Sequence, residues 1–199
     1  MASAAQQTRG VAAAIGRLTH TAALARLDER GRAWLTALAL LWALTLLASI
    51  ATAAIPPLAG AARGLLALHL APVTNPPPSP GRVLAIAAHN IRTAGWPLLL
   101  PYLGAQRRVW SRTLADSAVF ASVAVNAVLV GLALGAYQAR LLPYVPQLPL
   151  EWAGVAVAPA DWWLRRDDTH GGRHRVAAAA LVVLLVAAAV VETCLVPHR

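Results

Sequence analysis

Residues 34–55 read WLTALALLWALTLLASIATAAI and contain no charged side chain. At a rise of about 1.5 Å per residue, a helix of this length crosses the roughly 30 Å hydrocarbon core of a bilayer. A signal peptide is the alternative, but its apolar run usually covers only about 7–15 residues and follows a shorter amino-terminal region. We therefore predict that residues 34–55 form an uncleaved transmembrane helix.

The composition of the whole chain agrees with this prediction. Of the 199 residues, 58% are hydrophobic and 13% are charged, whereas about 25% are charged in an ordinary soluble domain. Much of the excess is Ala, Leu and Val in unbroken runs, the pattern that membrane spans produce. These features indicate an integral membrane protein and argue against a soluble enzyme.

Four further segments are apolar enough to be spans. The shortest, 149–164, contains Pro159, which removes a backbone donor. Together with 34–55, these segments predict an all-α bundle of about five transmembrane helices, with residues 83–197 as a four-helix membrane domain. The predicted spans of this domain are 83–104, 116–137, 149–164 and 176–197.

Two segments on the amino-terminal side are predicted to lie outside the spans. Residues 1–33 are basic, with apolar side chains at helical spacing. They form either an amphipathic helix, on the membrane or on a partner, or a partly ordered tail. Residues 56–82 are Pro-rich and predict an extracytoplasmic linker, because Pro56 and Pro57 preclude a continuous helix. A short interfacial helix fits between the prolines, at 65–70.

The positive charge predicts the orientation. All 17 basic residues are Arg, and the formal net charge is +9. A basic chain can bind nucleic acid, but in so apolar a sequence the positive-inside rule explains the arginines better. With a cytoplasmic amino terminus, the inner segments 1–33, 105–113 and 165–175 hold 12 of the 17. The Lys-free, Ala- and Arg-rich composition suggests a GC-rich bacterial genome, so we expect a bacterial cell membrane and no nucleic-acid partner.

Polar side chains inside the predicted spans are the candidates for function, because they are costly in lipid unless paired. Arg92 lies near the middle of its segment, and we expect it to pair with Glu192 or, as second choice, with Glu151. A transport or signalling role for these residues, and outward snorkelling of Arg92, are the alternatives. The candidate intramembrane polar network consists of Asn90, Arg92, Asn126, Glu151 and Glu192.

Other residues favour packing over chemistry. Asn126 is expected to form an interhelical hydrogen bond, and Gly131 and Gly135 to let two helices approach closely. His170 and His174 lie on a predicted loop, and the glycines between them do not suit a metal site. The sequence contains no phosphate-binding glycine loop, nucleophile elbow or zinc-protease helix. It therefore predicts no catalytic, metal-binding or cofactor-binding residue.

Four motifs follow one another from residue 83 to the carboxyl terminus: HNIR at 89–92, NAVLVG at 126–131, VPQLPLE at 145–151 and ETCLVP at 192–197. In these motifs the chain resembles the stage II sporulation protein M family, a group of small polytopic bacterial membrane proteins. It departs from the family pattern at Ala127, Gln147, Leu148 and Val196, where Gly, His, Gly and Thr are usual. The resemblance implies a multi-pass helical protein. The best-known member works with peptidoglycan-degrading partners, but many members occur in bacteria that do not sporulate.

Two functional hypotheses follow. The first is a non-enzymatic scaffold or assembly subunit of a membrane complex, with a link to remodelling of the cell envelope or peptidoglycan. The second is a permease-like subunit of a transporter that a separate ATPase drives. The polar residues inside the apolar segments favour this second hypothesis. The expected partners are the lipid bilayer and either other membrane or envelope proteins or further copies of the chain.

Overall fold

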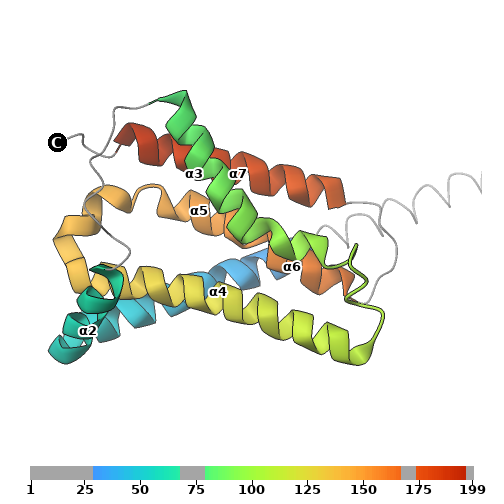
Figure 1. The fold of residues 1–199 in the computed structure, drawn as a ribbon, viewed down its shortest axis with the longest axis horizontal. Helices are drawn as coiled ribbons and strands as arrows, with labels where there is room; N and C mark the ends of the chain where they lie inside the picture. Colours follow the sequence, from blue (N-terminus) through green and yellow to red (C-terminus); the bar gives the residue numbers. More distant parts are fainter. Residues whose placement is uncertain (1–28, 68–78, 167–173, 196–199) are drawn as a thin grey trace, which may run out of the picture.

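The computed structural model describes residues 29–67, 79–166 and 174–195, and every regular element in these ranges is a helix (Figure 1). The predicted all-α class is therefore confirmed. The first helix, Glu29–Ala54, is drawn in blue. The elements that follow it are α2 (Pro56–Ala67), α3 (Pro80–Gly95), η1 (Trp96–Leu99), α4 (Val109–Tyr137), η2 (Gln138–Tyr144), α5 (Leu148–Val155), α6 (Val157–Arg165) and α7 (His174–Leu195).

Three helical stretches in the described ranges are long and apolar enough to cross a membrane: Glu29–Ala54, Val109–Leu142 and His174–Cys194. Large apolar side chains protrude from these stretches. Leu47, Ile50, Phe120 and Val183 are 59% to 66% exposed. Proteins surrounded by water rarely expose apolar patches above a few hundred Å², whereas lipid chains cover such surfaces without penalty. The surfaces thus support a membrane protein.

The other two predicted spans are interrupted, and proline explains both interruptions. Helix α3 ends at Gly95, and Pro97 falls in the 3₁₀ turn η1. Between α5 and α6 the helix breaks after Val155, whose carbonyl is the one that the ring of Pro159 would strike in a continuous helix. Segments 83–104 and 149–164 are therefore not single helices of spanning length.

The expected linker 56–82 begins with a helix, which corrects the prediction. Helix α2 starts directly at Pro56, because a proline in the first turn sacrifices only an N–H that has no helical partner. It runs to Ala67 and packs against α4, and Arg63 Nη1 donates a 3.5 Å hydrogen bond to the Ala136 carbonyl. The predicted helix at 65–70 lies partly outside the described residues, as does most of the predicted segment 1–33.

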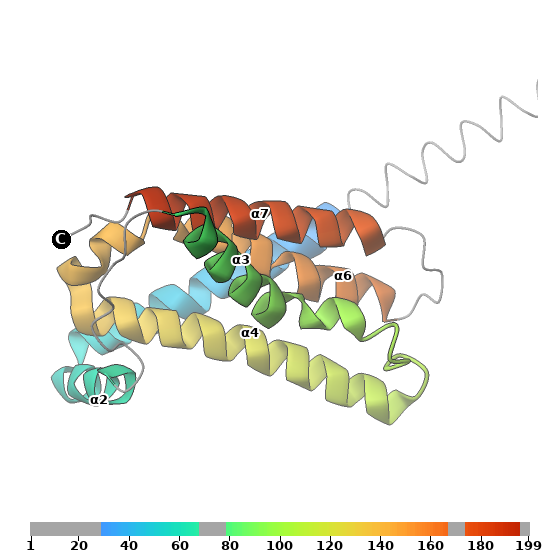
Figure 2. The same ribbon diagram turned by 45° about the horizontal axis from the view of Figure 1, so that its top comes forward.

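The long helices begin at one end of the bundle. We call the end where the first helix, α4 and α7 start the proximal end, and the opposite end the distal end. Helices α3 and α5–α6 run the other way (Figure 1), and α7 packs along α3 and α5. Both Figure 1 and Figure 2 show α3 crossing α7.

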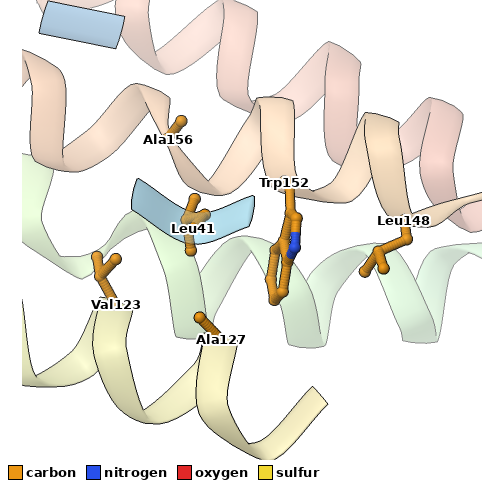
Figure 3. Packing of buried hydrophobic residues seen from close by; sticks show 6 residues of the cluster. All are labelled: Leu41, Val123, Ala127, Leu148, Trp152 and Ala156. Carbon is orange, nitrogen blue, oxygen red and sulfur yellow. The ribbon is translucent and has the colours of Figure 1, made fainter. Parts of the chain in front are cut away.

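One hydrophobic core joins the first helix, α4 and α5. Figure 3 shows Leu41 of the first helix facing Val123 and Ala127 of α4, with Trp152 of α5 beside them. Leu148 and Ala156 complete this cluster. The Trp34 indole donates a 3.0 Å hydrogen bond to the Ala153 carbonyl and so ties the first helix to α5 as well.

Gly131 and Gly135 lie where α4 meets the first helix at close range. A Cβ on Gly131 would collide with the Thr45 carbonyl oxygen and approach the Ala48 Cβ to 2.7 Å. A Cβ on Gly135 would likewise collide with the Ser49 carbonyl. The absence of side chains at these two positions permits backbone contact, the arrangement typical of small-residue pairs in membrane helices.

Candidate functional site

Part of the predicted polar network comes together in the distal half of the bundle. Asn90 of α3 donates a 3.4 Å hydrogen bond from Nδ2 to Glu151 Oε1 of α5. Glu192 of α7 lies close enough to Glu151 for the two carboxylates to repel each other. Three helices therefore contribute one polar group each to this distal cluster, and all three side chains are half-buried.

Arg92 does not join the distal cluster, which corrects the expected ion pair. It is exposed, and it forms no hydrogen bond or ion pair with the residues that the structure describes. The arginine that attracts Glu192 is Arg82 in the first turn of α3. Ten residues separate the two arginines, or about 15 Å along the helix axis. Arg92 instead occupies the last turn of α3, where a positive charge favours the helix dipole.

Double-mutant cycles should show that Glu192 interacts with Arg82 and not with Arg92. We expect Arg82→Gln and Glu192→Gln to couple by about 0.2–1 kcal/mol, the range measured for partly exposed ion pairs. Arg92→Gln should be additive with Glu192→Gln, because the two side chains are not in contact. Thermal unfolding in mild detergent measures both cycles. Coupling to Arg92 and none to Arg82 would restore the pair expected from the sequence.

Asn126 also behaves differently from the expectation. Its Nδ2 donates a 2.9 Å hydrogen bond to the Ser122 carbonyl of the same helix, α4. Ser122 Oγ in turn accepts a 3.4 Å hydrogen bond from the Trp96 indole of η1. The contact between helices near Asn126 thus runs through Ser122 and Trp96, because the amide already has a partner on its own helix.

The most deeply buried charges in the described part of the chain form a proximal cluster that the sequence pattern does not reveal. Asp161 and Arg165 of α6 and His174 of α7 are only 6%, 7% and 9% exposed. Arg165 Nε donates to Asp161 Oδ2 over 2.8 Å. His174 Nδ1 lies 2.7 Å from the same oxygen, and Nε2 faces the Leu98 carbonyl of η1. One carboxylate oxygen therefore joins α6 to α7, and the His174 ring links both to η1.

His174 is the first residue of α7, and both of its ring nitrogens face oxygen acceptors. The Tyr102 ring lies over the imidazole, with centroids 5.0 Å apart.

A second carboxylate, Asp116 of α4, fixes the end of α6. Trp162 Nε1 donates to Asp116 Oδ1 over 2.8 Å, and Arg166 Nη1 donates to Asp116 Oδ2 over 3.2 Å. The Arg166 guanidinium also lies 3.5 Å from the centre of the Trp163 ring, a favourable cation–π geometry. Asp116 thus joins α4 to a helix that starts 41 residues later in the sequence, at the break before Pro159.

The sequence places His174 in the basic segment 165–175 and so gives no sign that it belongs to the proximal cluster. The structure makes it the first residue of α7. One sequence signal was present: Asp161 and Arg165 are spaced i, i+4, the spacing of helical ion pairs. That signal identifies the pair but not its third partner, which comes from another helix.

An apolar groove opens at the proximal end beside these charges. One face of the first helix between Glu29 and Leu40 lines it, together with side chains of α4 between Asp116 and Val123 and of α6 between Pro159 and Leu164, and its volume is about 540 Å³. The first helix touches α4 at Gly131 and Gly135 in the distal half. Towards the proximal end the two helices diverge and leave a wedge-shaped space between them, which α6 closes on one side.

Comparisons of the chain with known protein families, curated proteins and solved structures gave no match.

Proposed function

We propose that the protein is a multi-pass membrane scaffold or assembly subunit, with its amino terminus in the cytoplasm, that holds partner proteins in a bacterial cell-membrane complex. The observation that carries this proposal is the use of its buried and half-buried charges. Asp161 holds Arg165 and His174, and Asp116 holds Trp162 and Arg166, so both carboxylates tie helices together. These ion pairs and hydrogen bonds stabilise a fixed arrangement of helices, which a scaffold requires.

The outer surface supports the same role. Exposed apolar side chains occur on several helices, including Leu47 of the first helix, Leu84 of α3 and Val183 of α7. Within a bilayer, helix association depends on shape and packing, because lipid tails are as apolar as leucine. A rigid bundle with distinct faces can therefore select partner helices. The resemblance to the stage II sporulation protein M family favours partners that act on the cell envelope.

A permease-like subunit is the second candidate, and the distal cluster favours it. Glu151, Glu192 and Asn90 bring two carboxylates and an amide together between α3, α5 and α7. Polar groups at such depth are often part of ion or substrate pathways, and interrupted helices such as α5–α6 recur in transporters. On this hypothesis the partner is an ATPase.

Site-specific photo-crosslinking in living cells tests the scaffold. We expect a photoreactive amino acid at one or more of Leu47, Leu84 and Val183 to give a discrete adduct with another protein or with a second copy of the chain. The same residue at the buried Leu185 is the matched negative control. An adduct that forms equally after dilution in mild detergent reports a stable complex and not a collision.

The identity of the partner decides between the two candidates. A structural or wall-degrading envelope protein supports the scaffold, and a cytoplasmic ATPase supports the permease. Lipid adducts alone at all three exposed positions would contradict the scaffold.

A further inference from the structure

The side chains that line the groove change along its length, from charged ones at one end to apolar ones at the other. On the first helix its lining runs from Glu29 and Arg32 through Thr36 to Leu40, a rise of about 16 Å. On α4 it runs in the same direction, from Asp116 to Val123. The walls on the first helix and α4 thus place their charged groups at the proximal mouth and their apolar groups towards the middle of the bundle, and α6 contributes an apolar wall.

The size of the groove favours one kind of occupant. A helix is about 10–12 Å in diameter with its side chains, so even a few turns would exceed about 540 Å³. Typical pockets for small ligands hold roughly 300–1,000 Å³ and are lined mainly by apolar side chains. A flexible hydrocarbon chain fits this space, and a partner helix does not.

The charges at the mouth indicate what the chain is attached to. Glu29 and Asp116 are negative, Arg32 is positive, and Arg166 stands behind Asp116 in contact with it. Both signs therefore meet at one level, which complements a headgroup carrying both phosphate and ammonium. Trp163, 56% exposed, borders the same level, as aromatic side chains do at membrane interfaces.

We propose that this groove binds a zwitterionic phospholipid, with one acyl chain between the first helix, α4 and α6 and its headgroup at the proximal mouth. The bound lipid fills the wedge that the Gly131–Gly135 crossing leaves open, and so braces the first helix against α6. The inference rests on the membrane placement of the proposed function but not on the scaffold role.

The test uses the full chain in bilayers that contain phosphatidylethanolamine with a photoactivatable group on one acyl chain. After irradiation, labelled peptides are mapped by mass spectrometry. We expect labelling of peptides that contain Leu40 and Phe120. Ala33→Phe, which fills the groove, should reduce this labelling on the order of tenfold, equivalent to about 1.4 kcal/mol of binding. Ala39→Phe is the matched control, because Ala39 is exposed on the same helix and lies outside the groove.

Thr36→Phe is a second variant that fills the groove, and it provides the test if Ala33→Phe does not fold. Thermal unfolding verifies that both variants are folded. Labelling that persists in both folded variants would overturn the proposal. So would a preference of the groove for an anionic phosphatidylglycerol probe, or a protein adduct in place of the lipid. Peptides around the lipid-facing Val183 serve as the reference. If these are labelled and the groove is not, the groove proposal fails; if neither is labelled, the membrane placement fails.

Discussion

Replacing Asp161 with Ala is expected to destabilise the protein by about 3–5 kcal/mol, the range for removing one partner of a buried ion pair. Asp161 is 6% exposed and accepts hydrogen bonds from Arg165 and His174. Without the carboxylate, the Arg165 guanidinium remains buried with no compensating charge, and the His174 ring loses the acceptor at its Nδ1. Thermal unfolding in mild detergent, followed by circular dichroism, measures the loss.

Two comparisons make this expectation specific. Arg175→Ala removes an exposed charge next to His174 and should change stability by no more than about 0.5 kcal/mol. The double variant Asp161→Ala with Arg165→Ala should lose less than the sum of the two single variants, since both members of the pair are then absent. A strictly additive double variant would mean that Asp161 does not hold Arg165.

Gly131→Ala is expected to separate the first helix from α4. The added Cβ meets the Thr45 carbonyl oxygen and the Ala48 Cβ, and backbone cannot move aside as a flexible side chain would. Overpacking of well-packed cores typically costs about 1–3 kcal/mol and at times more, and the upper part of that range applies here. The measurements are thermal unfolding and the efficiency of a disulfide between cysteines introduced on the two facing helices.

Gly31→Ala is the matched control for this substitution. Gly31 lies in the first helix, and a Cβ there meets nothing within 4 Å. The same exchange should therefore be neutral or stabilising, by up to roughly 1 kcal/mol, because Ala favours the helix over Gly. Equal melting temperatures for Gly131→Ala and Gly31→Ala would show that the close crossing does not form.

The sequence alone determined the helical class and three of the long helices. Unbroken apolar runs such as 34–55 leave the backbone no partner in lipid except itself, so a helix follows directly from composition and length. The effect of Pro159 was also visible, because a missing N–H is a local property. The same reasoning overestimated the helix-breaking effect of Pro56 and Pro57, which begin α2. A proline breaks a helix in its interior but is tolerated in its first turn.

The tertiary structure decided which polar groups meet. The sequence identified Asn90, Glu151 and Glu192 as members of one cluster, but it chose Arg92 in place of Arg82 for Glu192. A pairing predicted from the sequence depends on where each span is taken to begin, and an error of a few residues there moves a side chain by several ångströms along the helix axis. Asp161, His174 and the Leu98 carbonyl come from three separate elements. Whether they meet depends on the position and rotation of each helix relative to its neighbours. The packing of side chains from distant segments sets that geometry. Hydrophobic periodicity in the sequence predicts only the helices themselves.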